Sequence, residues 1–305
     1  MGATTRWIDD TGNSLDQIIE KLLADTEEKR FEDKTSYINV QVNKVFETNQ
    51  TIILNNKTIT YNLINYVYDS VYPGDSPIEE RKTPISGSVI VYLNGDKVGY
   101  IVDKNYNALT ELRWLIGYKG RLEILKNESS IHSELLIWII SRIFKEENEL
   151  ILSLSEENEI KLILNSIVGF KGQTDDQVSF VSADGDSILN ILSTLSFLLE
   201  SKLLQQIKLR LQFEDHENVE LVLKDNKTIA VNINKYDGPF DDYGNKYKRY
   251  SELYLLIYLD IMPMLYSNYQ QDLDNELWGT PQKKEFLTSV RDKLIQKINE
   301  KVESI

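Results

Sequence analysis

Apolar positions recur at helical spacing near both ends of the chain. An apolar stripe runs through residues 15–23, and Ser14 followed by Gln17 matches a capping box at its start. Near the other end, Thr280 as cap and Pro281 as first helical residue predict a helix whose apolar positions recur as far as Val302. Its spacing does not keep a strict heptad, so we expect it to dock by one face rather than pair with another copy in a coiled coil.

Alternating apolar and polar residues predict antiparallel strands between these helices. Residues 51–54 and 58–61 read as one hairpin, and residues 89–93 and 98–102 as a second hairpin around Asn94 and Gly95. Further strands are predicted at residues 38–42, 150–154, 160–164, 207–213, 219–223 and 228–233. The last three of these form a meander.

Longer apolar runs predict the remaining helices, at residues 108–116, 131–144, 188–203 and 246–269, the last with a kink at Pro263. Because the strands come as hairpins and a meander, the pattern predicts an α+β fold with antiparallel hairpins and a three-strand meander interleaved with helices, and a helical C-terminal region.

Proline and glycine residues gather in residues 72–88, which predicts a domain boundary or a long loop there. A length of 305 residues suits one large or two modest domains, at about 150 residues each. We therefore expect an N-terminal helix with a small β unit in residues 1–80, a central α+β core in 81–235 and the helical region in 236–305.

Charge and composition narrow the functional classes. The net charge of −14 disfavours binding to nucleic acid, which needs a basic face. The absence of cysteine excludes disulfides and thiolate sites and is consistent with a reducing compartment. No signal-peptide h-region opens the chain and no long apolar run follows, so we expect a cytoplasmic protein without a membrane span. The richness in Ile, Asn, Lys and Tyr is typical of AT-rich bacterial or phage genomes.

Motifs for nucleotide binding and for serine hydrolases are absent, and the chain has two histidines. His132 is expected to pack against or cap the helix that follows it. His216 lies in an acidic turn, and we expect it to be solvated, with its pKa raised by nearby carboxylates.

A metal-dependent nuclease is the enzymatic hypothesis that these residues support. Glu159 and Lys161 form an acid-x-Lys pair on a predicted strand, with Glu147, Glu149, Glu156 and Glu157 upstream. In such a site carboxylates hold a divalent metal and the lysine orients the attacking water. The same short pattern is common on any half-exposed strand. Outside this hypothesis the sequence predicts no metal site and no cofactor.

Tyrosines provide the signal for a protein interface. Tyr243, Tyr247, Tyr250, Tyr254 and Tyr258 recur every three or four residues, which places them on one stripe of a helix. Tyrosine is enriched where proteins bind one another, although buried tyrosines in a core show the same spacing. A second cluster comprises Tyr61, Tyr66, Tyr68 and Tyr72.

The first functional hypothesis is a non-enzymatic protein that binds another protein, as an adaptor, an inhibitor or a subunit of a larger assembly, in a setting such as conflict between bacteria and phages. The second is the nuclease or another nucleic-acid-processing protein centred on Glu159 and Lys161. The third is a structural homo-oligomer. Whether the chain is an enzyme stays open, although the missing motifs favour the binding hypothesis.

Overall fold

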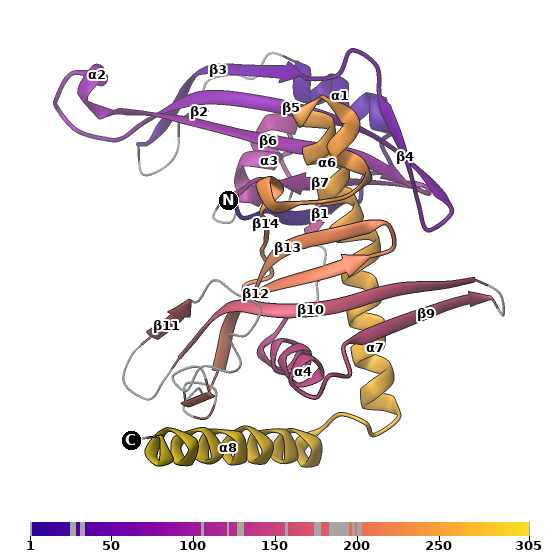
Figure 1. Cartoon of the computed structure of the whole chain (residues 1–305). Helices are drawn as coiled ribbons and strands as arrows, with labels where there is room; N and C mark the ends of the chain where they lie inside the picture. Colours follow the sequence, from indigo (N-terminus) through magenta and orange to yellow (C-terminus); the bar gives the residue numbers. More distant parts are fainter. Residues whose placement is uncertain are drawn as a thin grey trace. The chain divides into compact units, whose positions relative to one another are not determined.

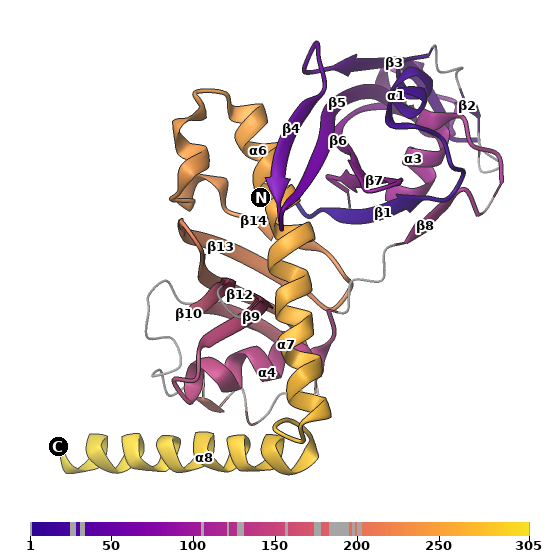
Figure 2. The ribbon, with the colours of Figure 1, turned by 90° about the vertical axis from the view of Figure 1, so that its right-hand side faces the viewer.

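The chain divides into two compact units, seen in the computed structural model in Figures 1 and 2. The N-terminal unit comprises Gly2–Glu128 with Asn245–Leu255, and the C-terminal unit comprises Ser129–Gly244 with Leu256–Ile305. The structure describes residues 2–24, 29–30, 34–104, 107–120, 122–126, 131–155, 158–173, 178–182, 195–196, 199 and 203–304.

The N-terminal unit is built on one antiparallel sheet. Its described residues form eight strands in the order β2-β3-β5-β6-β7-β1-β8, with β4 paired to β5. The bounds are β1 Thr5–Asp9, β2 Lys29–Arg30, β3 Ser36–Lys44, β4 Gln50–Leu54, β5 Lys57–Val71, β6 Lys82–Asn94, β7 Lys97–Val102 and β8 Ile124–Lys126. Residues 72–88 join β5 to β6 through the short helix α2 (Ile78–Arg81) and continue into β6, at the end of one long hairpin.

Helices α1 (Leu15–Leu23) and α3 (Ala108–Ile116) contribute their apolar faces to the core of this unit. Both halves of the capping box between Ser14 and Gln17 are present at the start of α1, as predicted. The buried face of α1, which includes Ile18 and Leu22, joins one cluster with residues of β5, β6 and β7. Burial of this apolar stripe stabilises the helix far more than its intrinsic propensity does.

Two glycines allow tyrosine rings to lie flat across neighbouring strands. Tyr66 pairs with Gly87, and Tyr92 pairs with Gly99. A Cβ atom at Gly87 would lie 2.3 Å from the Tyr66 hydroxyl oxygen, and one at Gly99 would lie 2.3 Å from Cζ of Tyr92. Any larger residue would therefore displace these buried rings.

A second antiparallel sheet forms the centre of the C-terminal unit. Over the described residues it has six strands in the order β11-β10-β12-β13-β14, with β9 paired to β10. The bounds are β9 Glu149–Ser155, β10 Asn158–Gln173, β11 Val178–Ser182, β12 Leu203–Phe213, β13 His216–Lys224 and β14 Ile229–Val231. Strands β12, β13 and β14 are the predicted meander.

Helices pack on this sheet and on one another. Helix α4 (Ser133–Phe144) contacts β10 and β12, and α7 (Met262–Asp274) contacts β9 and α4. The indole N–H of Trp138 in α4 donates a hydrogen bond of 2.8 Å to Asp272 in α7. The remaining helical elements are η2 (Ile233–Lys235), η3 (Pro239–Tyr243), α6 (Lys246–Leu256), a π-helical turn η4 (Ile257–Ile261) and α8 (Thr280–Glu303).

The irregularity predicted at Pro263 takes the form of this π turn. Proline lacks the N–H that an α-helix needs, and its ring clashes with the carbonyl four residues earlier. A wider turn directly before Pro263 relieves that clash, and the helical path continues into α7.

The predicted α+β class is confirmed, as are both hairpins, the meander and the helix at 131–144. The helix predicted at 188–203 lies largely outside the described residues, and β12 already begins at Leu203. The last helix has Gly279 as its cap, one residue before the predicted Thr280. None of the helices that the structure describes combines the length and the apolar character needed to cross a bilayer.

Candidate functional site

Glu159 and Lys161 lie on β10 with exposed side chains. The Lys161 ammonium is 3.0 Å from a carboxylate oxygen of Glu149 on β9, and its backbone N–H donates to Glu214 at 2.7 Å. The hydrogen bond and charge of Glu149 raise the pKa of Lys161, with smaller contributions from Glu159 and Glu214. Lys161 therefore stays charged at neutral pH.

The described residues contain no group of three or more Asp, Glu or His side chains arranged to hold a metal ion. Glu156 and Glu157 lie outside those residues. The nuclease interpretation of Glu159 and Lys161 stays a prediction.

The five tyrosines of the predicted stripe differ in exposure and belong to different units. Tyr247, Tyr250 and Tyr254 lie on α6 in the N-terminal unit, whereas Tyr243 and Tyr258 belong to the C-terminal unit. Tyr254 and Tyr258 are buried, Tyr243 and Tyr250 are half-buried, and Tyr247 is 39% exposed. Their role in partner binding stays a prediction, and Tyr247 is the member that presents most surface.

The second tyrosine cluster has three buried members, whose hydroxyl groups donate to carboxylates of the N-terminal unit. Tyr66 and Tyr68 donate to Glu111 at 2.8 and 3.0 Å, and Tyr61 donates to Glu252 at 2.8 Å. Burial, followed by the charge of Glu111, raises the pKa of Tyr66 and Tyr68. Tyr66 and Tyr68 therefore stay protonated and act as neutral donors.

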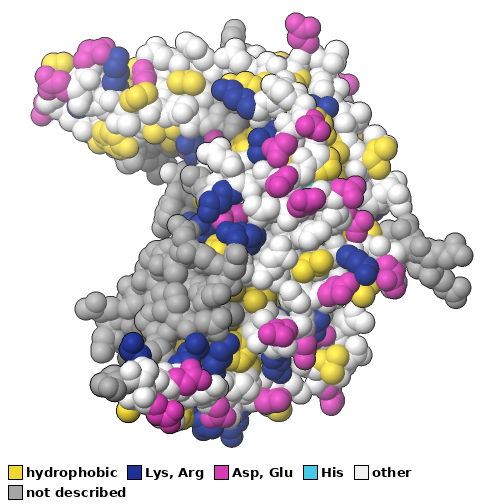
Figure 3. All heavy atoms as spheres, in the orientation of Figure 1, with side chains coloured by type: hydrophobic (Ala, Val, Ile, Leu, Met, Phe, Trp, Pro, Cys, Tyr) yellow, Lys and Arg dark blue, Asp and Glu magenta, His cyan; other side chains and the backbone are white. Residues whose placement is uncertain are grey.

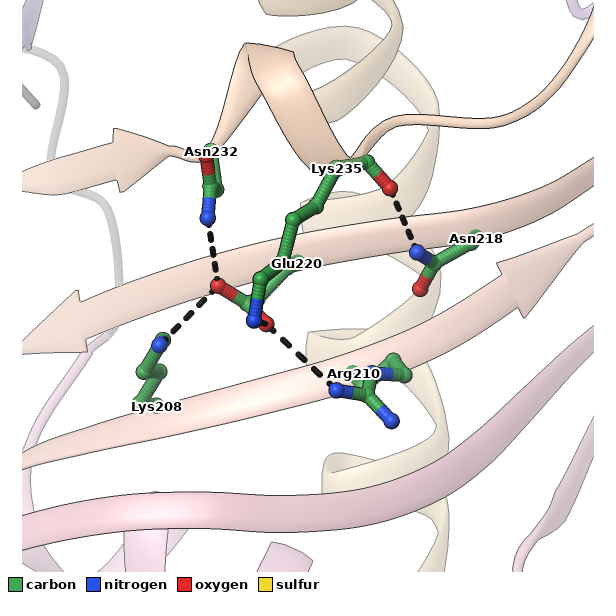
Figure 4. Close-up of polar contacts among 6 residues, drawn as sticks. All are labelled: Lys208, Arg210, Asn218, Glu220, Asn232 and Lys235. Atoms are coloured by element: carbon green, nitrogen blue, oxygen red, sulfur yellow. Dashed lines mark hydrogen bonds and ion pairs between the residues drawn. The ribbon is translucent and has the colours of Figure 1, made fainter. Parts of the chain in front are cut away.

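The C-terminal unit buries a carboxylate among cations. Glu220 on β13 has no exposed surface. One of its oxygens lies 3.0 Å from the Lys208 ammonium and accepts a hydrogen bond of 2.8 Å from Asn232 (Figure 4). The other oxygen lies 3.4 Å from the Lys235 ammonium and 3.7 Å from the Arg210 guanidinium.

Strand pairing explains this cluster. Lys208 and Arg210 alternate with core residues on β12, and Arg210 pairs directly with Glu220 on β13. Burial alone would raise the pKa of Glu220, but the hydrogen bond from Asn232 and the charges of Lys208 and Lys235 outweigh it and lower that pKa. Glu220 is therefore ionised at neutral pH and fixes three cationic side chains on one face of the sheet.

His216 lies in the interior, contrary to the solvated turn expected from the sequence. It is 8% exposed, with its ring 4.7 Å from Phe240 and 6.4 Å from Phe213. Burial lowers its pKa to about 4 and outweighs the nearby Asp215 charge, so the expected rise is wrong. The Tyr236 hydroxyl accepts from the Phe240 N–H and lies within hydrogen-bonding distance, 2.6 Å, of Nδ1 of His216. His132, as predicted, caps α4 by accepting from the Leu135 N–H.

Helix α8 has two halves that differ in burial. In its proximal half, residues 280–294, Phe286 and Val290 have no exposed surface, and the Phe286 ring packs edge-on against Phe144 at 5.6 Å. In its distal half, residues 295–303, Ile295, Ile298 and Val302 are 49%, 46% and 65% exposed. Both ribbon views show the last turns running out beyond α4.

A groove of about 790 Å³ follows the proximal half of α8. Its apolar lining includes Tyr269 and Leu273 of α7, Trp278, and Leu287 of α8, and its cationic lining includes Lys284 and Arg291. Figure 3 shows charged and hydrophobic side chains mixed along the lower edge of the view, over α8. This groove and the exposed apolar stripe of the distal half form the α8 surface, the candidate binding site of the C-terminal unit.

No model of a known protein family matches the chain, and no curated protein matches its sequence. The residue pattern revealed the amphipathic character of α8, but it could not show that its apolar residues are covered in one half and exposed in the other. It also missed Glu220, whose signal would have been alternating cations on one strand and an acid on its partner strand.

Proposed function

We propose that this chain acts by binding another protein, as an adaptor, an inhibitor or a subunit of a larger assembly, through the α8 surface. The proposal depends on the exposure of Ile295, Ile298 and Val302 on one face of a helix that buries Phe286 and Val290 in its preceding turns.

Single exposed apolar residues are normal on protein surfaces, but a row of them on one helix is not. Positions 295, 298 and 302 are spaced three and four apart, which is how a helix presents its anchors to a groove in a partner. The flanking residues are polar, among them Gln296 and Asn299, and such residues surround an apolar centre in many interfaces.

The distal half alone spans roughly 14 Å, at 1.5 Å per residue, which is too short for a stable interface of about 800 Å² on each partner. The groove along the proximal half adds adjoining surface on the same helix. The proposal therefore assigns the whole α8 surface to partner binding.

A capture experiment tests this proposal. A tagged chain is incubated with nuclease-treated lysate of the source cells, alongside the Ile295→Asp/Ile298→Asp double variant and an Ile53→Asp control. Ile53 is 73% exposed on β4 of the N-terminal unit, so its substitution introduces the same charge elsewhere.

We expect a stoichiometric protein partner with the wild-type chain and the control, and its loss with the double variant. Equal capture by all three chains would place the interface elsewhere and contradict the proposal. Partners that disappear on nuclease treatment would favour the nucleic-acid hypothesis instead.

A further inference from the structure

The groove and the exposed stripe lie on one continuous face of α8. Lys284, Leu287 and Arg291 line the groove, and Ile295, Ile298 and Val302 form the stripe. These six positions are spaced three, four, four, three and four residues apart, which is the spacing of one helix face. One half of this face thus offers a largely apolar groove, and the other half offers apolar side chains that are about half exposed or more.

We propose that a second copy of this chain occupies this face, with the two α8 helices antiparallel about a two-fold axis near Ile295. This inference rests on the proposed function and names the partner. In this arrangement Ile298 and Val302 of each copy lie against the groove of the other, beside Leu287 and the aliphatic stem of Arg291. The same contact is made twice, as two-fold symmetry requires.

Charge favours the antiparallel arrangement over the parallel one. A parallel pair would set Lys284 against Lys284 and Arg291 against Arg291, which is repulsive. The antiparallel pair brings Lys284 of one copy toward Glu303 of the other, and both side chains are exposed in the single chain. The helix dipoles also oppose one another in that arrangement.

The first test is the mass of the purified chain by light scattering. We expect twice the 35.4 kDa of one chain, with a return to 35.4 kDa for Ile295→Asp/Ile298→Asp and no change for the Ile53→Asp control. Lys284→Glu and Glu303→Lys should each lower the dimer fraction, and their combination should restore it.

Cysteine cross-linking tests the direction of pairing, because the natural chain has no cysteine. Ile295→Cys should form a disulfide between copies, since a disulfide needs Cβ atoms about 4 Å apart. Lys284→Cys mixed with Glu303→Cys should cross-link, and Lys284→Cys alone should not. Cross-linking by Lys284→Cys alone would overturn the antiparallel arrangement.

A wild-type chain that stays at 35.4 kDa at all concentrations would overturn self-pairing. The proposed function would survive that result if the double variant still lost a different partner from lysate. It would fail together with self-pairing if the double variant captured the same proteins as the wild-type chain.

Discussion

Two regions of the C-terminal unit differ in which side chains they bury: one buries ionisable groups, and the other exposes apolar ones. Around Glu220 and His216, ionisable groups lie in the interior, and side chains of the same unit supply their partners. On the distal half of α8, apolar side chains are about half exposed or more, so the unit covers them only in part. Interior polar groups whose hydrogen-bond partners belong to the same unit stabilise the fold. Exposed apolar groups along one face of a helix indicate a surface that binds another molecule.

The comparison predicts that substitutions in the first region cost stability and that substitutions in the second cost binding. The proximal half of α8 belongs with the first region, since Phe286 and Val290 are buried there.

Phe286→Ala should have the largest effect. It removes a fully buried ring and its contact with Phe144, so we expect a loss of about 3–5 kcal/mol in the free energy of unfolding. Urea unfolding monitored by circular dichroism measures this loss. A change below about 1 kcal/mol would show that the proximal half is not docked as described.

Glu220→Ala should have the next largest effect, a loss of about 3 kcal/mol in the free energy of unfolding, because it removes the carboxylate around which three cations cluster. The partial exposure of those cations keeps the loss below that of a fully buried pair. Glu217→Ala on the same strand is the matched control, because its side chain is exposed, and it should change stability by less than about 0.5 kcal/mol. Equal effects of the two substitutions would contradict the role given to Glu220.

His216 should make stability depend on pH. Its pKa of about 4 in the folded chain lies below the ordinary value of 6.5, so the unfolded chain binds more protons between these values. The contribution of neutral His216 to the free energy of unfolding is therefore fully present well above pH 6.5 and is lost as the pH falls toward 4. At pH 5 the loss is at most roughly 2 kcal/mol, because solvent screening reduces it. His216→Gln should flatten this part of the pH profile relative to the wild-type chain, and an unchanged slope would count against a buried neutral imidazole.

Tyr66→Phe extends the comparison to the N-terminal unit. It deprives the buried Glu111 carboxylate of one of its two tyrosine donors, so we expect a loss of about 1–2 kcal/mol. Tyr72→Phe is the control, because Tyr72 is 52% exposed, and it should be nearly neutral. Thermal unfolding of both variants shows whether the Tyr66 hydroxyl contributes to the free energy of unfolding.

Ile298→Ala should have the smallest effect on folding, within about 0.5 kcal/mol of the wild-type chain, because its side chain is already half exposed. Urea unfolding of the dilute chain, at concentrations where self-pairing is negligible, measures it. A loss of 2 kcal/mol or more would mean that the distal half of α8 is held by its own unit.

The sequence predicted those parts of the fold that local signals determine. Gly95 marks its hairpin because the two-residue turn between the paired Asn94 and Lys97 needs a positive φ at its first position. Ser14 with Gln17 marks the start of α1 through a local exchange of hydrogen bonds. Features that depend on distant pairing could not be read in this way. His216 looks solvated among acidic neighbours, but Phe213 lies opposite it in the β12–β13 pair, and Tyr236 and Phe240 pack on it from the segment after β14.

The candidate site was predicted less completely, for the same reason. Helical spacing identifies an apolar face on residues 280–303 but not what lies against it. The tyrosine spacing at 243–258 likewise fits a core or an interface, and the burial of Tyr254 and Tyr258 follows from tertiary packing that no local pattern contains.

Cysteine labelling in cells tests the central claim, that the distal half of α8 is covered when the protein works, most directly. Ile298→Cys and Ile53→Cys each introduce one thiol at a position that is exposed in the single chain. We predict that Ile298→Cys reacts with a maleimide at least about tenfold more slowly in cells than in the dilute purified chain, while Ile53→Cys reacts at the same rate in both. Equal rates for Ile298→Cys in the two settings would contradict it.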